Sequence, residues 1–152
     1  MNPSRIKSLL SRLSRFLSLP LGDRIRLLVA TSLLLSLPFV LTVSHFDRIR
    51  TRLVQVSDLL EMLVVGSPTP TRIVWAVEAA DHDLPGDRTC LVRSLTAETL
   101  LRLYGYHPRH QIGVTKTTEG MEAHSWLEYG SDVLIGDIEN LSEYVLLRTA
   151  NQ

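Results

Sequence analysis

The chain has 152 residues, of which 45% are hydrophobic and 21% charged, and its formal net charge is zero. This length suits one domain, and the composition is that of a globular protein rather than a disordered one. The zero net charge conceals an asymmetry between the two parts of the chain. Residues 1–60 carry nine Lys and Arg against three Asp, whereas the remainder carries seven basic and thirteen acidic residues. The two parts therefore suit different partners, or each other.

The first part of the chain is predicted to be helical. An amphipathic helix ending near Pro20 is indicated by apolar residues at three- and four-residue spacing, namely Ile6, Leu9, Leu10, Leu13 and Leu17. A second helix is expected from Asp23, as its N-cap, to about Leu37, where Pro38 ends or kinks it. A third helix is indicated by the stripe Ile49, Leu53, Val56, Leu60 and Leu63.

Residues 27–43 form an uncharged, apolar run behind an Arg-rich leader. Such a run resembles a signal peptide or a short membrane helix. Seventeen residues is at the lower limit for spanning a bilayer, Pro38 interrupts the run, and no small-residue cleavage site follows it. A buried helix is therefore the favoured interpretation, and a membrane contact is the alternative.

The second part of the chain changes from helices to strands. A turn over residues 66–70 separates a predicted N-terminal helical region, 1–66, from a core domain, 67–152. A fourth helix is expected over residues 71–81, and a fifth from Cys90 to about Tyr104, with Thr89 as its N-cap and Gly105 as its stop. Strands are expected at 111–114, 122–129 and 132–135. We expect an α+β fold.

Cys90 is the only cysteine, so it cannot form an internal disulfide, and its predicted place is the first turn of a helix. Free backbone N–H groups and the positive end of the helix dipole stabilise a thiolate there, and the same groups are suited to bind an oxyanion. Arg88 and Arg93 add positive charge nearby. A lone cysteine in an apolar helix is more often a core residue, so Cys90 needs partners to be read as a nucleophile.

Hairpin register supplies a candidate pair of partners. A two-residue loop at Gly130-Ser131 suits a type II′ turn, and it pairs residues whose numbers sum to 261. His124 then lies opposite Asp137 with Cβ atoms about 4.5–5.5 Å apart, whereas Asp132 points to the other face. A carboxylate at that distance orients an imidazole that acts as base for a thiol. Cys90, His124 and Asp137 are therefore the predicted catalytic residues.

Other candidate sites are weaker. Asp81-His82-Asp83 lacks a further ligand and is read as a solvated helix end, so no metal is expected. His107 and His110 flank Pro108 and are predicted to be surface residues of a turn. The chain has no GxxxxGK[ST], GxGxxG or GxSxG motif, so no cofactor is expected. The N-terminal arginines alternate with leucines as on a solvated helix face, so nucleic-acid binding is not expected.

Several blocks of this sequence, in their order and spacing, resemble a known family. They are Thr89-Cys90-Leu91-Val92-Arg93-Ser94-Leu95, residues 100–105, Ile112-Gly113-Val114, Ala123-His124-Ser125-Trp126-Leu127-Glu128 and Ile135-Gly136-Asp137. The chain resembles the transglutaminase-like cysteine peptidases of lasso-peptide biosynthesis, which remove the leader from a ribosomally made precursor. Val92 and Ser125 differ from the residues that the family often has there, proline and alanine, but neither change removes a catalytic group.

The resemblance implies a papain-like peptidase core, with a Cys at a helix N-terminus packed on a small antiparallel sheet. It also implies that Cys90 is the nucleophile, His124 the base and Asp137 the orienting acid. With 152 residues the chain has little room for a leader-recognition domain, so we expect the split type. Its partners would then be the precursor peptide, a separate leader-recognition protein and a macrolactam-forming cyclase, in the cytoplasm.

The function expected from the sequence is leader removal by a Cys-His-Asp triad. An acyltransferase or transglutaminase-type enzyme with the same triad is one alternative. A non-catalytic peptide-binding subunit of a maturation complex is another, and a membrane-anchored protein using residues 27–43 is a third.

Overall fold

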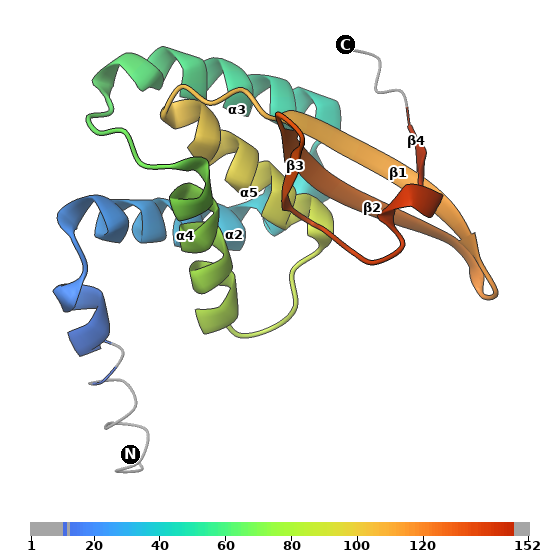
Figure 1. The fold of residues 1–152 in the computed structure, drawn as a ribbon, viewed down its shortest axis with the longest axis horizontal. Helices are drawn as coiled ribbons and strands as arrows, with labels where there is room; N and C mark the ends of the chain where they lie inside the picture. Colours follow the sequence, from blue (N-terminus) through green and yellow to red (C-terminus); the bar gives the residue numbers. More distant parts are fainter. Residues whose placement is uncertain (1–10, 12, 148–152) are drawn as a thin grey trace.

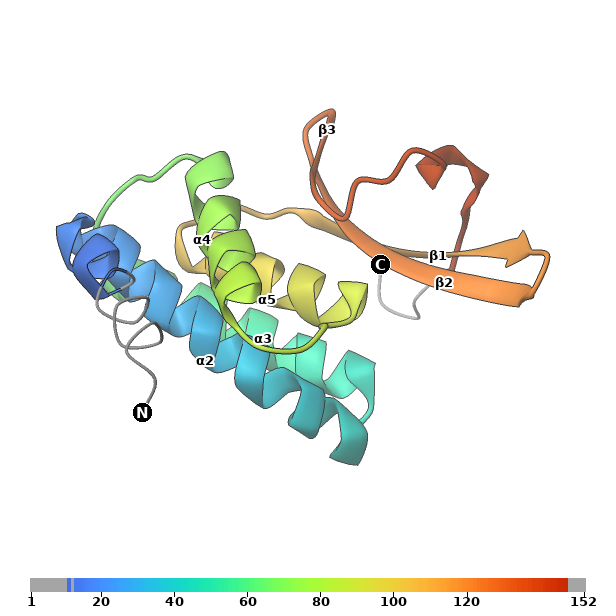
Figure 2. The same cartoon turned by 90° about the horizontal axis from the view of Figure 1, so that it is seen from below.

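The computed structural model describes residue 11 and residues 13–147, and it has the expected α+β fold (Figure 1). The helices come first: α2 (Leu21–Val43), α3 (Phe46–Leu60), η1 (Glu61–Leu63), α4 (Pro70–Asp83) and α5 (Cys90–Leu103). The strands follow: β1 (Arg109–Thr117), β2 (Gly120–Tyr129), β3 (Asp132–Ile135) and, after η2 (Leu141–Glu143), β4 (Val145–Leu146). The helices α2 to α5 lie on one side of the antiparallel sheet, with α5 against β2 (Figure 2).

The helix predicted before Pro20 is described only in part. Residue 11 and residues 13–18 are helical, and the remainder of that predicted helix lies outside the described residues. The helix predicted at 71–81 is confirmed as α4, which begins at Pro70. Its N-cap is Thr69, whose Oγ1 accepts a hydrogen bond from the Arg72 N–H.

Helix α2 differs from its prediction at both ends. It begins at Leu21, and Asp23 is no N-cap, because its buried carboxylate is held by Arg72 of α4 and by Arg26. Pro38 does not end the helix either, and α2 continues to Val43. A proline removes a single N–H donor, and here the packing of Leu34 and Leu37 keeps the helix against its neighbours.

The expectation of a buried helix at residues 27–43 holds for only one face of α2. Only 17% of the most apolar stretch of α2 is buried, and this helix is long and apolar enough to cross a membrane by length and composition. The apolar stripe predicted for the third helix is likewise only partly buried: Ile49 is buried, whereas Val56 and Leu63 are exposed. Both helices therefore carry more apolar side chains than the described core covers.

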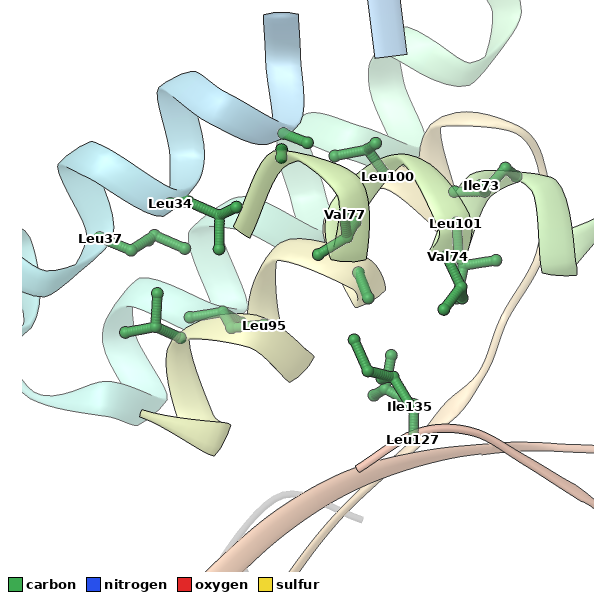
Figure 3. Packing of buried hydrophobic residues seen from close by; sticks show 14 of the residues in the cluster. Leu34, Leu37, Ile73, Val74, Val77, Leu95, Leu100, Leu101, Leu127 and Ile135 are labelled. Carbon is green, nitrogen blue, oxygen red and sulfur yellow. The ribbon is translucent and has the colours of Figure 1, made fainter. Parts of the chain in front are cut away.

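The hydrophobic core is a single cluster to which α2, α4, α5 and the sheet all contribute (Figure 3). Ala30 and Leu34 of α2 meet Val77 of α4 and Leu95 of α5, and Leu127 and Ile135 extend the cluster onto the sheet. Helices on both sides of the turn at residues 66–70 share this cluster. Burial of these side chains contributes roughly 1.5–3 kcal/mol each, before the cost of ordering the chain.

Helix α5 and the turn between β2 and β3 form as predicted because their signals are local. Thr89 caps α5 by accepting from the Val92 N–H, and Gly105 follows the helix with a φ of 78°. Gly130 has a φ of 63°, while no residue other than glycine has a positive φ in the described chain, as a type II′ turn at Gly130-Ser131 requires.

The sheet has the order β3-β2-β1-β4 and contains two features that were not predicted. Strand β1 is longer than its prediction and pairs with β2 over its whole length through a second tight hairpin, with Thr117 opposite Gly120. The short strand β4 returns to the other edge of β1, where Leu146 pairs with Gly113. It brings Tyr144 over the sheet, beside His124 of β2.

The predicted register between β2 and β3 is wrong beyond the first two pairs. Tyr129 pairs with Asp132 as expected, but a bulge pairs Leu127 with Ile135 instead of Leu134. Strand β3 ends at Ile135, so Asp137 lies outside the ladder and has no partner in β2. A bulge inserts one extra residue and reverses which side chains share a face, and sequence alternation gives no sign of it here.

We predict that truncating two adjacent leucines of α2 changes the stability by very different amounts. Leu34 is 0% exposed and Leu35 is 57% exposed. Leu34→Ala should lower the free energy of unfolding by roughly 2–5 kcal/mol because it removes packed methyl groups and leaves a cavity, whereas Leu35→Ala should change it by less than about 0.5 kcal/mol. Urea unfolding followed by circular dichroism measures both, and equal losses would contradict the assigned faces of α2.

Candidate active site

Cys90 is the first residue of α5 and is half-buried. The first hydrogen bond of the helix runs from the Arg93 N–H to the Thr89 carbonyl, and the Val92 N–H is taken by the Thr89 side chain. The N–H groups of Cys90 and Leu91 precede these bonds, so the helix does not use them. They are donors available beside the thiol, together with the positive end of the α5 dipole.

The arginines expected to add positive charge at Cys90 share one carboxylate. Arg88 Nη1 lies 3.4 Å from Asp81 Oδ1, and Arg93 Nε lies 3.2 Å from Asp81 Oδ2. Arg88 also donates to the carbonyl groups of Gly86 and Pro85, which closes the loop before α5. Both arginines therefore fix the start of the helix, and with Asp81 they leave one net positive charge there.

His124 lies on β2, and its ring is held by the backbone. Its Nε2 is 2.7 Å from the Gly136 carbonyl oxygen. A carbonyl only accepts, so Nε2 carries the proton, and in the neutral ring Nδ1 carries the lone pair. The orienting role that was predicted for a carboxylate is thus filled in this structure by the carbonyl of the residue before Asp137.

Two glycines make room for this arrangement. Gly136 has a φ of 84°, and a Cβ there would lie 2.7 Å from the Ser125 carbonyl and 2.8 Å from the Trp126 Cβ. Gly113, the β1 partner of His124, is equally crowded, because a Cβ would lie 3.0 Å from Trp126 and from Tyr144. Any larger residue at either position would move the strand segments that surround the imidazole.

Two aromatic side chains lie beside His124. The Tyr144 ring is 5.7 Å from the His124 ring, Trp126 stacks on the imidazole at 6.1 Å and 17°, and the Trp126 and Tyr144 rings are 6.4 Å apart. Burial raises the pKa of the Tyr144 phenol, a hydrogen bond with Glu122 raises it further, and the charge of Cys90 adds to the effect. His124, Trp126 and Tyr144 therefore form one aromatic cluster on the sheet.

Asp137 is the predicted site residue that the structure leaves apart. Its side chain is exposed and, among the described residues, forms no hydrogen bond or ion pair. It directly follows Gly136, so its carboxylate lies near the backbone group that holds His124. Asp132, the rejected alternative, pairs with Tyr129 at the far end of the hairpin.

A buried polar network behind the site was not predicted. Ser94 Oγ of α5 lies 2.7 Å from Ser125 Oγ of β2, and both hydroxyls contact His110 Nε2, at 3.1 and 2.8 Å. His110 Nδ1 is 2.6 Å from Glu98 Oε2, and Arg50 of α3 contacts both oxygens of that carboxylate, at 3.0 and 2.8 Å. The prediction that His110 is a surface residue is wrong, whereas His107 is exposed as expected.

The sequence holds one signal for this network. Ser94 and Glu98 are four residues apart on a helix that is otherwise mainly apolar, so they share one face, and His110 alternates with Ile112 along β1. Burial opposes ionisation of Glu98, but the hydrogen bonds from His110 and Arg50 outweigh it and lower its pKa to about 2. Glu98 is therefore a carboxylate in the core, compensated from two sides.

The Asp81-His82-Asp83 segment gives no metal site in the structure. Asp81 is engaged by Arg88 and Arg93, and within the described part of the chain no group of three His, Cys, Asp or Glu side chains is placed to hold a metal ion.

A thiol at the N-terminus of a capped helix, packed on an antiparallel sheet that carries a backbone-oriented imidazole, defines a cysteine-peptidase or acyltransferase type of fold. Residues 33–149 match the family model described as the transglutaminase-like superfamily. The chain belongs to this superfamily, whose members are generally enzymes. Comparisons with curated proteins and with solved structures found no match.

We predict that Glu98 makes the protein sensitive to acid. Its folded pKa of about 2 is below the ordinary value of 4.5, so its stabilisation is complete above about pH 4.5 and is lost as the pH falls toward 2. A shift of this size corresponds to roughly 3 kcal/mol. Glu98→Gln should lose about this amount at pH 7 and should flatten the decline of stability between pH 5 and 3.

Urea unfolding at pH 7, 5, 4 and 3 measures both effects, with Glu78→Gln on the exposed face of α4 as the matched control. The pKa of Asp23 is also lowered, because the hydrogen bond from Arg72 outweighs the opposing effect of burial. The decline of stability with falling pH that remains in Glu98→Gln therefore reports Asp23. A decline as steep in Glu98→Gln as in the unmodified protein would contradict the assignment.

Proposed function

We propose that this chain is a cysteine peptidase that removes the leader from a ribosomally made lasso-peptide precursor, using Cys90, His124 and Asp137. The observation that carries the proposal is the position of Cys90 at the open N-terminus of α5, a helix whose Ser94 hydroxyl lies 2.7 Å from that of Ser125, the residue after the His124 that Gly136 orients. Membership of the transglutaminase-like superfamily supports the reaction class. The resemblance of the Cys90, His124 and Asp137 blocks to the lasso-peptide peptidases supports the substrate.

In the proposed reaction, His124 Nδ1 takes the thiol proton of Cys90, and the sulfur attacks the carbonyl carbon of the bond between leader and core. The carbonyl oxygen becomes an oxyanion, for which the N–H groups of Cys90 and Leu91 are donors. The C–N bond then breaks, and the His124 imidazolium returns its proton to the leaving amine, which becomes the N-terminus of the core peptide.

Water completes the proposed cycle. His124 takes a proton from the water that attacks the thioester, the C–S bond breaks, and the imidazolium returns its proton to the Cys90 sulfur. The leader then leaves with a new C-terminal carboxyl group. Asp137 has the role of stabilising the imidazolium through its negative charge from beyond Gly136. No step requires a metal or an organic cofactor.

The proposal includes partners and a compartment. A chain of the split type works with a separate leader-recognition protein, which presents the precursor, and with a macrolactam-forming cyclase, which uses the new amine. The single thiol suits the reducing cytoplasm.

Cys90→Ala should abolish leader removal while preserving the fold, because Cys90 is half-buried and the cap at Thr89 remains. We expect a loss of at least about 10³-fold in rate. Purified protein, the precursor found among neighbouring genes and the leader-recognition protein are incubated, and the products are followed by mass spectrometry. Leu91→Ala is the control on the same helix turn.

Full cleavage by Cys90→Ala would refute the peptidase assignment. Products that carry an added amine in place of water would identify acyl transfer by the same site, and they would place the chain with the transglutaminase-type alternative.

Asp137→Asn should slow cleavage by roughly five- to tenfold, since one charge near the imidazolium contributes on the order of 1 kcal/mol through solvent. Asp132→Asn removes the same charge at the hairpin end and should leave the rate within about twofold. The ratio of kcat/KM values between these two variants is the measurement. Equal rates in both would assign the orientation of His124 to Gly136 alone.

A further inference from the structure

One side of α2 presents apolar side chains that no described residue covers. They lie three, four or seven positions apart along the helix and are all about half exposed or more: Leu21, Ile25, Leu28, Leu35, Phe39 and Val43. A helix of 23 residues is about 35 Å long, and residues 27–43 contain no charge. The exposed side is therefore a long apolar stripe, far larger than the scattered single leucines of ordinary surfaces.

The stripe continues onto the loop after α3. Ile25 and Val29 of α2 line the same pocket as Val64, so this loop adjoins the N-terminal half of α2. The loop and the preceding helix end carry four of the most exposed apolar residues of the described chain, Leu59, Met62, Leu63 and Val65, with Met62 93% exposed. We call the exposed side of α2, together with this loop and helix end, the apolar face.

Positive charge borders the apolar face. Val40 shares a pocket with Arg48 and Arg52, both exposed on α3, and Arg15 is exposed beyond the other end of α2. Of the nearby carboxylates, Asp23 is buried against Arg72 and Asp58 pairs with Arg102, whereas Asp47 is exposed at the start of α3. Among the described residues, the exposed arginines 15, 48 and 52 therefore provide the basic border of the apolar face.

We propose that the apolar face docks on an anionic lipid bilayer, with α2 lying parallel to the membrane plane. Apolar side chains with a basic border match the acyl chains and the anionic headgroups of such a surface. A bilayer also needs no shaped groove on its partner, and the stripe along α2 runs the length of a single helix. The chemistry of the face therefore fits a lipid surface better than the sculpted interface of a protein partner.

The opposite face of α2 excludes a spanning arrangement. Ala30, Leu34 and Leu37 are packed against α4 and α5, and the Asp23 carboxylate is bound to Arg72 at 2.6 Å. Crossing the bilayer would strip these contacts and carry a paired carboxylate with the helix. Docking by one face keeps them all.

The candidate active site adjoins the C-terminal end of α2. Pro38, Leu41 and Thr42 line a pocket with Arg88 and Thr89, the residues just before Cys90. Leu41 packs against the core, so docking by the apolar face leaves this pocket on the protein side of the helix. This placement does not depend on which peptide is cleaved.

Vesicle flotation of the full chain tests the proposal, using vesicles of phosphatidylcholine alone and of phosphatidylcholine with 30% phosphatidylglycerol (about one anionic lipid in three, a choice within the range where surface charge acts). The protein should float with the anionic vesicles and bind the neutral ones at least tenfold more weakly. Leu28→Glu/Phe39→Glu should bind the anionic vesicles at least tenfold more weakly, since both side chains are exposed and their replacement leaves the core intact. Met121→Glu/Leu146→Glu changes two equally exposed apolar residues of the sheet and should bind normally.

Four results would overturn the proposal. The protein could fail to float with either vesicle, or it could float equally well with Leu28→Glu/Phe39→Glu. It could also form a dimer in light scattering that these two substitutions dissociate, in which case a second copy covers the face. Resistance to extraction at pH 11 would likewise overturn it, because it would show a spanning helix. Far-UV circular dichroism of each variant verifies that the fold is retained.

Discussion

The buried carboxylate of Glu98 is the contact on which the geometry of the site depends. It is 0% exposed and joins α5 to Arg50 of α3 and to His110 of β1. The other ring nitrogen of His110 contacts the hydroxyls of Ser94 and Ser125. An ion pair in the core contributes less to net stability than its Coulomb energy, but it tolerates few alternative arrangements, because any other leaves a charge unpaired.

This network also bears on the candidate catalytic residues Cys90 and His124. Ser94 is one helical turn after Cys90, and Ser125 is the residue after His124, and their hydroxyls are 2.7 Å apart. The helix that carries the thiol and the strand that carries the imidazole are therefore joined directly behind the site. A shift of α5 along β2 would break this contact and the contacts of Ser94 and Glu98 with His110, so the network holds α5 and β2 in register.

The sequence predicted those parts of the fold that are governed by adjacent residues. The Thr89 cap, the Gly105 stop and the Gly130-Ser131 turn each follow from the chemistry of one or two positions. Three features escaped prediction because they depend on contacts between distant segments. The bulge at Leu127 and the burial of His110 are set by packing of the sheet on α5, and Pro38 is tolerated because α2 is held by its neighbours.

The same distinction explains how the candidate site was found for a partly mistaken reason. Hairpin alternation selected Asp137 as the partner of His124, yet the bulge removes that pairing, and Gly136 supplies the hydrogen bond. The bulge and the positive φ of Gly136 act together: one lengthens the path by a residue, and the other turns its carbonyl toward the ring. Orientation by a carbonyl fixes the tautomer without placing a second negative charge beside a thiolate. Arg88 and Arg93 share the single carboxylate of Asp81, so one net positive charge remains beside the start of α5, and because Gly136 fixes the tautomer, the role proposed for Asp137 is confined to its charge.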